Sequence, residues 1–278
     1  MRFKLTISVI RLLPIGLIGV WFAQPSQAEE IPKWEFGLGV GGVSVPHYRG
    51  SDQRKEYAAP VPYIRYSGER LKVDREGGRF FFYEGDVMKV DASASFSFPV
   101  DSDENRARQG MPDLDPILEL GPRVQFYLYE SDDRAFRVRA ALPVRMAIAT
   151  DLSNAANAGW VFSPYLQLRY SSSWNASLSV GPIWATEKYH DYFYQVDPEF
   201  ATATRPAYDA SGGYSGSRIT LTSSKRFNNI WVGFFARYDS LNGAVFENSP
   251  LVKRNDSLMV GVAISYIFMR SKQMVEID

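Results

Sequence analysis

The strongest constraint on the fold is an alternation of apolar with small or polar residues, which runs through segments longer than ordinary strands. Residues 258–268 carry Leu, Val, Val, Ile, Tyr and Phe at every second position. The same period of two recurs in residues 118–129, 136–148, 175–184 and 231–239. Such a period places successive side chains on opposite faces of a β-strand, so each segment has one large apolar face. The pattern predicts an all-β protein, because no helical stripe of similar strength follows residue 28.

The length of these segments favours a barrel that crosses a membrane. They run for about 9 to 13 residues, whereas strands of soluble domains typically have about 5 to 6. A tilted strand needs about 9 to 11 residues to cross the hydrocarbon of a bilayer. A secreted soluble β-sandwich, whose strands would alternate in the same way, is the alternative.

Aromatic residues lie near many of the predicted strand ends, as in the two interfacial girdles of an outer-membrane barrel. They are Trp34, Tyr63, Tyr66, Tyr127, Tyr129, Trp160, Tyr170, Trp184, Tyr238, Tyr266 and Phe268.

Composition excludes several other classes of protein. The 278 residues include 31 Lys and Arg, 31 Asp and Glu, and 14% aromatic residues, which excludes a disordered chain. A mean hydropathy of −0.22 excludes a protein with several apolar membrane helices. The lack of cysteine excludes disulfides, thiolate metal sites and a cysteine nucleophile. The neutral charge balance gives no reason to expect nucleic acid as a partner.

The first 28 residues predict a cleaved signal peptide. Arg2, Lys4 and Arg11 form a positive n-region, a short apolar run covers residues 12–23, and cleavage is expected after Ala28. An uncleaved anchor is the alternative, but the apolar run is too short to span a membrane. The expected organisation is a signal peptide (1–28), a barrel (29–268) and a polar C-terminal tail (269–278). The expected location is the outer membrane of a Gram-negative cell.

The connections between strands alternate between short turns and long loops. Outer-membrane barrels place short turns in the periplasm and long loops outside. Counting back from a last strand that ends in the periplasm, every long segment lies outside only if residues 71–83 hold two strands. A tight hairpin at Glu76-Gly77-Gly78 would provide them. The prediction is a transmembrane antiparallel up-and-down β-barrel of about 12 strands, or ten if residues 71–90 are not fully folded into hairpins.

The second face of several strands carries charges, which we expect to line the barrel interior. The predicted interior residues are Glu119, Arg123, Arg137, Arg139, Arg145, Arg169, Arg237 and Asp239. One reading is a narrow water-filled path that favours small anions. The other is that the charges pair with one another and close the interior, since buried charges need partners.

No residue pattern predicts a catalytic site. Only two histidines exist, and His190 is followed by Asp191 at the start of a long loop. Adjacent residues of an extended chain point to opposite faces, so this pair is poorly placed to form a base and its partner. We expect His190 to be solvated, and we predict no catalytic, cofactor-binding or metal-binding residues.

Two loop features carry structural expectations. Tyr189, Tyr192, Phe193 and Tyr194 are expected to fold inward as a plug or to pack across the barrel mouth. The acidic residues of 101–104 are expected to be a solvated charge run, with contact to divalent cations as the alternative.

Several stretches resemble the MipA/OmpV family of outer-membrane proteins. They are Tyr194–Phe200, Arg205–Tyr214, Ser224–Gly233, Arg237–Val252, Gly39–Ser51, Pro60–Tyr63 and Gly110–Pro116. The similarity spans essentially the whole mature chain. One departure is the polar tail from Met269 to Asp278, because a terminal strand of this kind would usually end at an aromatic such as Phe268.

The resemblance implies a non-enzymatic scaffold for murein synthesis. Such a barrel would bring a lytic transglycosylase together with a bifunctional penicillin-binding protein at the periplasmic side of the membrane. The other expected partners are outer-membrane lipid and the barrel-assembly machinery, through the last strand. No cofactor is implied. The alternative function is a narrow channel for small, anionic solutes.

Overall fold

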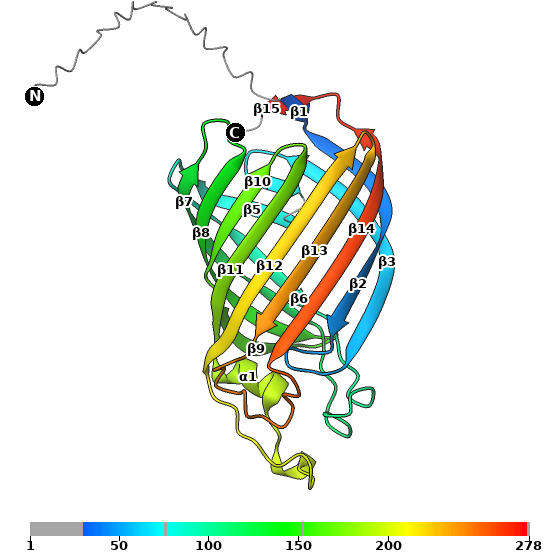
Figure 1. The fold of residues 1–278 in the computed structure, drawn as a ribbon, viewed down its shortest axis with the longest axis vertical. Helices are drawn as coiled ribbons and strands as arrows, with labels where there is room; N and C mark the ends of the chain where they lie inside the picture. Colours follow the sequence, from blue (N-terminus) through cyan, green and yellow to red (C-terminus); the bar gives the residue numbers. More distant parts are fainter. Residues whose placement is uncertain (1–29, 75–76, 152, 277–278) are drawn as a thin grey trace, which may run out of the picture.

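The computed structural model describes residues 30–74, 77–151 and 153–276, and it shows a single antiparallel β-barrel (Figure 1). The first half of the chain contributes β1 (Glu30–Pro32), β2 (Trp34–Pro46), β3 (Arg54–Ser67), β4 (Leu71–Asp74), β5 (Gly77–Glu84), β6 (Met88–Ser97) and β7 (Ile117–Glu130). The second half contributes β8 (Phe136–Thr150), β9 (Ala155–Phe162), β10 (Tyr165–Ser171), β11 (Trp174–Ala185), β12 (Gly213–Phe227), β13 (Ile230–Ser240), β14 (Asp256–Arg270) and β15 (Met274–Glu276). A helix, α1 (Glu187–Tyr194), and a 3-10 turn, η1 (Pro198–Phe200), lie between β11 and β12.

Within the described residues the wall has 12 strands, of which β4 and β5 form a hairpin too short to span it, and this confirms the predicted fold class. The segments β9 and β10 form one spanning strand, because β8 pairs with β10 along its first half and with β9 along its second half. The predicted hairpin between residues 71 and 83 is present as β4 and β5, so the ten-strand alternative is wrong. The first and last spanning strands, β2 and β14, pair with each other and close the barrel. A two-layer sandwich is excluded by this closed strand order.

The closure between β2 and β14 depends on backbone contact. A Cβ atom added at Gly39 would lie 1.9 Å from the carbonyl oxygen of Ile264 and 2.5 Å from the Cα of Ser265. Only glycine permits the two strands to approach this closely.

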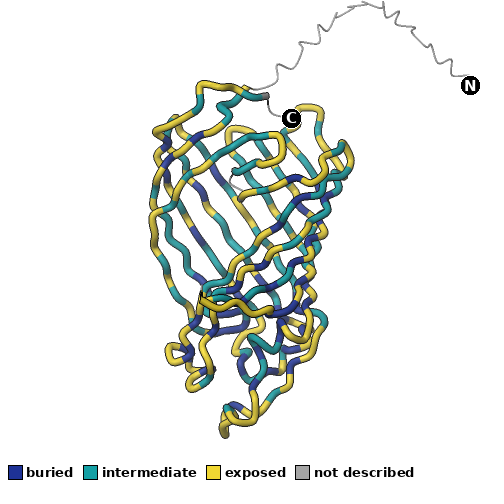
Figure 2. Tube along the Cα trace, turned by 180° about the vertical axis from the view of Figure 1, so that it is seen from behind, coloured by how far each residue is buried: buried dark blue, intermediate teal, exposed yellow. Residues whose placement is uncertain are grey.

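Residues that alternate in the sequence lie alternately on the outer and the inner face of the barrel. On β14, Val262 is 61% exposed and Ile264 48% exposed, whereas Ser265 is 2% exposed. Figure 2 shows this succession of exposed and less exposed residues along the wall, with buried segments gathered among the long loops. The outward residues form the apolar surface that faces lipid.

Two of the predicted girdle aromatics are in fact interior residues. The ring of Tyr63 lies 5.7 Å from that of Trp231, and both side chains border a cavity inside the barrel. Tyr127 borders the same cavity, with the ammonium of Lys89 5.1 Å from its ring. Position near a strand end does not show which face a residue occupies, whereas alternation does: Tyr63 lies on the face of Arg65, and Tyr127 on the face of Arg123.

Short turns and long loops occupy opposite ends of the barrel, as predicted (Figure 1). The short turns follow β3, β5, β7, β10 and β12, and they face the periplasm. At that end β14 continues to Arg270, and the following residues form β15, which pairs with β1 from Pro32↔Met274 to Glu30↔Glu276. The polar tail therefore joins the start of the barrel in a small two-stranded sheet.

The predicted signal peptide and its cleavage site after Ala28 lie outside the described residues. No helix in the described part of the chain has the length and apolar character needed to cross a membrane.

Candidate functional site

The interior of the barrel is divided into cavities that run from the periplasmic end to the long loops. A cavity of about 780 Å³ lies nearest the periplasmic turns, and a second of about 630 Å³ lies in the middle of the barrel. The two share lining residues, including Val61, Arg169 and Trp231. A third space of only about 90 Å³ follows below α1. The lumen is therefore wide at its periplasmic end and narrow at its outer end.

All eight predicted interior residues border these cavities. Arg137 lines the periplasmic cavity, and Arg139 and Arg169 line both large cavities. The remaining five line the central or the narrow outer space: Glu119, Arg123, Arg145, Arg237 and Asp239. The alternation rule thus locates them on one continuous inner surface.

Near the outer end, the buried carboxylates of Glu119 and Asp239 form ion pairs with arginines. The Nε of Arg145 donates to Glu119 Oε2 at 2.8 Å, and the hydroxyl of Tyr189 donates to Glu119 Oε1 at 3.1 Å. The Nε of Arg218 donates to Asp239 at 2.6 Å, and Arg49 lies 3.7 Å from the same carboxylate. Both acids are less than a tenth exposed. These contacts join the wall strands to the loops above them.

Two further buried acids were missed by the sequence reading. Glu35 on β2 accepts from Arg65 at 3.2 Å and from Arg226 at 2.8 Å. Asp91 on β6 accepts from Arg123 and also from the Nε2 of Gln125 at 3.0 Å. The signal was available, because Glu35 and Asp91 occupy inward positions of their own alternating strands.

The interior as a whole is basic. The described lining of the periplasmic cavity has two acids, Glu69 and Glu84, against nine basic residues. The basic residues are Arg65, Lys72, Arg79, Lys89, Arg137, Arg139, Arg169, Lys225 and Arg226. Internal pairing is therefore seen for Glu35, Glu84, Asp91, Glu119 and Asp239, whereas the arginines and lysines leave an excess of positive charge.

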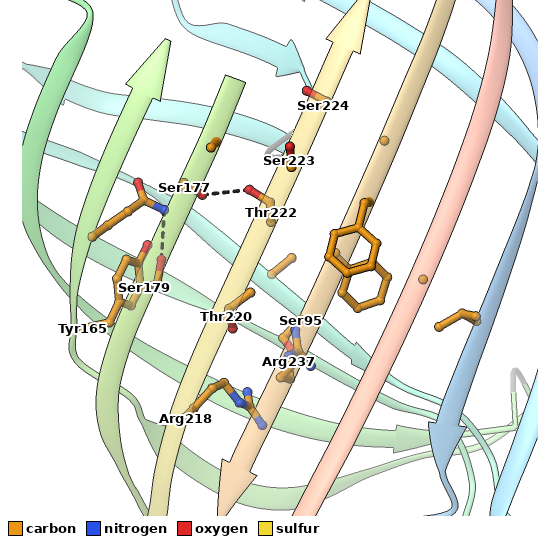
Figure 3. Close-up of a pocket in the computed structure, with 18 of the residues that line it drawn as sticks. Ser95, Tyr165, Ser177, Ser179, Arg218, Thr220, Thr222, Ser223, Ser224 and Arg237 are labelled. Atoms are coloured by element: carbon orange, nitrogen blue, oxygen red, sulfur yellow. Dashed lines mark hydrogen bonds between the residues drawn. The ribbon is translucent and has the colours of Figure 1, made fainter. Parts of the chain in front are cut away.

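A wall of hydroxyl and amide groups completes the central cavity. Ser177 and Thr222 lie 2.8 Å apart across β11 and β12, and Gln167 donates to Ser179 at 3.1 Å. Figure 3 shows Ser177, Ser179 and Thr222 among the residues that line the cavity, with Arg218 and Arg237 nearer the outer end. The surface is suited to polar and anionic groups.

The aromatic residues of the longest loop fold inward and form a plug, which is one of the two predicted arrangements. Helix α1 packs against the inner wall with Tyr189, which is 9% exposed, among Ile117, Ala147 and Ile183. The chain enters the helix through Thr186, whose Oγ1 accepts from the N–H of Trp160 at 3.0 Å. Gly159 has a φ of +101°, and a Cβ there would lie 2.4 Å from Thr186 Oγ1. The helix was not predicted, because it spans only eight residues inside a loop.

The expectation that His190 is solvated is wrong. Its side chain is fully buried, and its ring lies 4.6 Å from that of Phe246. The Nδ1–H donates to the carbonyl of Ser211 at 2.6 Å, and Nε2 accepts from the hydroxyl of Ser215. Burial lowers the pKa of His190 below its ordinary value. The neutral ring is satisfied on both sides by structural partners, and Asp191 is not one of them.

The long loops pack together above the plug, and we call this assembly the outer cap (residues 47–53, 98–116, 195–212 and 241–255). The rings of Tyr194 and Phe246 stack at 3.7 Å. The hydroxyl of Tyr48 donates to the carbonyl of Leu251 at 2.8 Å, and burial raises its pKa. Arg205 donates to the carbonyls of Ala107 and Gln109 at 3.1 and 3.0 Å. The outer cap has its own hydrophobic core and closes the outer mouth.

The acidic run in the outer cap is engaged by protein groups. Glu104 pairs with Lys55 at 2.6 Å, and a hydrogen bond from this lysine lowers the pKa of the Glu104 carboxyl. Asp101 accepts from the backbone N–H of Asp103 at 2.9 Å. Across the residues that the structure describes, no group of three or more His, Asp or Glu side chains is arranged to hold a metal ion.

Comparison with known proteins identifies the family. A family model described as "MltA-interacting protein MipA" matches residues 38–268. The MltA-interacting protein of Escherichia coli (strain K12) is 25% identical over 277 residues, covering 93% of this chain and 99% of the relative. The outer membrane protein Omp26La of Vibrio anguillarum is 25% identical over 226 residues, covering 78% of this chain and 80% of the relative. These relatives are named as interacting or outer-membrane proteins, and this outer-membrane barrel belongs to the MipA family.

Proposed function

We propose that this protein is a non-enzymatic scaffold at the periplasmic face of the outer membrane, where it links a lytic transglycosylase to a bifunctional penicillin-binding protein. The observation that carries the proposal is the asymmetry of the barrel: the outer mouth is filled by α1 and the outer cap, whereas the periplasmic end holds a cavity of about 780 Å³ and bears β1 and β15. The printed name of the Escherichia coli relative, MltA-interacting protein, supports a lytic transglycosylase as one partner.

The contact surface is proposed to be the periplasmic rim, defined as the short turns together with β1 and β15. Val87, in the turn between β5 and β6, is 68% exposed, and Met274 on β15 is 44% exposed. Apolar side chains that protrude at this end, beyond the strands, are suited to bind another protein. The polar tail after Phe268 contributes to this surface through β15.

A pull-down with purified components tests the scaffold. Detergent-solubilised protein is mixed with a lytic transglycosylase and a bifunctional penicillin-binding protein, and retention is measured for each alone and for both together. We expect Val87→Asp and Met274→Asp to reduce retention by about tenfold, since a buried charge in an interface costs more than about 1.4 kcal/mol. The matched control is Val245→Asp, an exposed apolar residue of the outer cap. Equal retention by all variants contradicts the assigned surface, and retention of neither enzyme by the unaltered protein contradicts the scaffold.

A contact with the barrel-assembly machinery is a further part of the proposal. We propose that β14 is the segment read by the barrel-assembly machinery, since it is the last spanning strand and pairs with β2 to close the barrel. Beyond Phe268, β14 contains only Met269 and Arg270, and the backbone of Arg270 is still paired with that of Glu35 on β2.

A channel for small anions is the second candidate, favoured by the basic lining of the periplasmic cavity. The plug opposes it, because the lumen narrows to about 90 Å³ below α1. A stable current through the purified protein in a planar bilayer would support the channel. If that current is seen and neither cell-wall enzyme is retained, the channel replaces the scaffold.

A further inference from the structure

Within the described part of the wall, the ladder between neighbouring strands is interrupted over one long interval. The β4–β5 hairpin lies between β3 and β6, but β4 pairs only with Tyr66 and Ser67 of β3. On the other side, β5 pairs with β6 only from Lys89 to Asp91. For the described residues, no ladder joins residues 54–65 of β3, or residues 92–97 of β6, to a strand on this side. We call the interval between these two edges the seam.

The backbone of β3 is adapted to remain unpaired at the seam. Residues 54–66 of β3 pair with β2 without a bulge. Just beyond the two ends of this ladder, the N–H of His47 donates to the carbonyl of Gln53, and the N–H of Ser67 donates to the carbonyl of Lys33. Because backbone groups alternate in direction, the odd-numbered residues of β3 bond to β2 and the even-numbered residues face the seam. Pro60 and Pro62 are even-numbered and carry no N–H. Proline in a strand is a mark of an edge, and here it removes two donors that a further strand would need.

The edge of β6 follows the same rule. The bond from Tyr127 N to Val87 O fixes which residues of β6 face β7, so the even-numbered Ala92, Ala94 and Phe96 direct their backbone groups to the seam. In a bilayer, backbone groups without a ladder persist only where they meet protein or line a cavity that holds polar groups. The seam must therefore communicate with the interior.

The seam is framed at both ends. At the periplasmic end lies the β4–β5 hairpin. At the outer end the rings of Tyr57 and Phe98 stack at 4.5 Å, and Lys55 pairs with Glu104 at 2.6 Å. The opening consequently lies in the half of the wall nearer the outer cap, which corresponds to the outer leaflet.

Both edges of the seam border the central cavity of about 630 Å³. Ala59 and Val61 of β3 and Ser93 and Ala94 of β6 are among its lining residues. The volume is within the range of about 300 to 1,000 Å³ that is usual for small-molecule sites. Tyr57, Val61 and Phe98 give the seam side of the cavity an apolar character.

Other strands bring cationic groups to the same cavity. Arg123, Arg145, Arg218 and Arg237 line it, and Figure 3 shows the last two beside its hydroxyl wall. Arg218 is held by Asp239, and Arg145 by Glu119. The Nε of Arg237 is buried and, among the described groups, has no hydrogen-bond partner. One cavity therefore combines an apolar entrance from the lipid with guanidinium groups that favour carboxylate or phosphate oxygens.

We propose that the seam is a lateral portal through which a single-chain anionic amphiphile of the outer leaflet enters the central cavity. Its acyl chain lies between the β3 and β6 edges, and its carboxylate or phosphate reaches the arginines, with Arg237 as the group that has bonding capacity to spare. A peptide strand added to the edge is the competing occupant, and Pro60 and Pro62 oppose it because they cannot donate to a ladder.

Photolabelling of the full protein in lipid nanodiscs locates the ligand. The probes are a fatty carboxylate and a monoacyl phosphate with a diazirine in the chain, and a fatty alcohol of equal length serves as the neutral control. We expect labels on residues 57–61 and 93–98 and on the cavity wall, with the alcohol labelling about tenfold more weakly. Arg237→Gln should reduce labelling by both anionic probes and leave the alcohol unchanged. The stronger of the two anionic probes identifies the headgroup. Labels spread evenly over the lipid-facing wall would overturn the proposal.

A reversible cross-link tests entry through the seam. The chain has no cysteine, so Ala58→Cys with Ala94→Cys can be bridged across the seam by bifunctional thiol reagents of graded length. The control pair is Ala236→Cys with Val260→Cys, outward neighbours in the complete β13–β14 ladder. We expect bridging at the seam to abolish labelling of the cavity wall, and reduction to restore it, whereas the control bridge has no effect. Cavity labelling that persists through the seam bridge overturns lateral entry. Should the bridge not form, the label positions on the unaltered protein still decide between seam and wall.

Discussion

At the scale of the residue, Glu119 connects the barrel wall to the plug. Its carboxylate accepts from Arg145 and from Tyr189, and all three side chains are buried. We expect Glu119→Ala to destabilise the folded barrel by about 3 to 5 kcal/mol, because it leaves Arg145 buried without its carboxylate. Glu119→Gln should cost less, since the amide oxygen still accepts one hydrogen bond. Denaturant unfolding in micelles measures the difference. Glu187→Ala, an exposed acid on α1, is the control and should stay within about 0.5 kcal/mol of the parent.

His190 makes the plug sensitive to pH. Burial holds its pKa in the folded protein below the value of about 6.5 expected in the unfolded chain. Between the two values the unfolded chain binds more protons, so the contribution is complete above about pH 6.5 and is lost as the pH falls through the folded pKa. We expect faster hydrogen exchange in α1 at about pH 5 than at about pH 7.5, after correction for intrinsic rates.

Two variants separate this effect from other titrations. His190→Gln should remove most of the pH dependence of exchange in α1. Burial also lowers the pKa of His47, which contacts Asn105 in the outer cap, so His47→Gln should leave the response of α1 in place. An unchanged pH response in His190→Gln would assign the effect to another group, but not to Asp191, because burial raises the pKa of this carboxyl and its protonation stabilises the folded state at low pH.

At the scale of the element, the sequence predicts the strands well but not the helix of the plug. The strands can be recognised in the sequence because lipid on one side and a polar lumen on the other impose a period of two on the wall segments. Helix α1 is held by the wall that it touches, through Tyr189, His190 and Tyr194, and eight residues are too few to show a helical period. The alternation that identifies Arg139 as an inward residue also identifies Glu35 as one. Which strands bring a given acid and arginine together depends on the register around the barrel, which no single segment encodes.

Barrel closure supplies a prediction for an element. Gly39→Ala would place a methyl group within 1.9 Å of the Ile264 carbonyl, so β2 and β14 must move apart. We expect a loss of at least about 1 to 3 kcal/mol of stability and less folded protein in the outer membrane. Gly42→Ala on the same strand is the control, because its nearest neighbour, the Tyr57 carbonyl oxygen, is 3.8 Å away. The folded fraction is read from the heat-modifiable band on a gel. Equal folded fractions for the two variants would show that the closing strands tolerate the methyl group.

At the scale of the whole molecule, the charge inside the barrel and the plug at its outer mouth together determine conduction. The unaltered protein is expected to carry no steady current, because α1 and the outer cap fill the outer end. Replacing residues 187–211 by a short glycine-serine turn is compatible with the wall, since Ala185 and Gly213 are already paired neighbours on β11 and β12. The opened barrel should pass anions in preference to cations, because basic side chains outnumber acids along its lumen. Reversal potentials in a salt gradient measure this preference, and Arg237→Glu in the opened barrel should weaken it. An opened barrel that stays silent would place the barrier in the remaining loops of the outer cap or in the wall, while a current from the unaltered protein would mean that the plug moves aside without help.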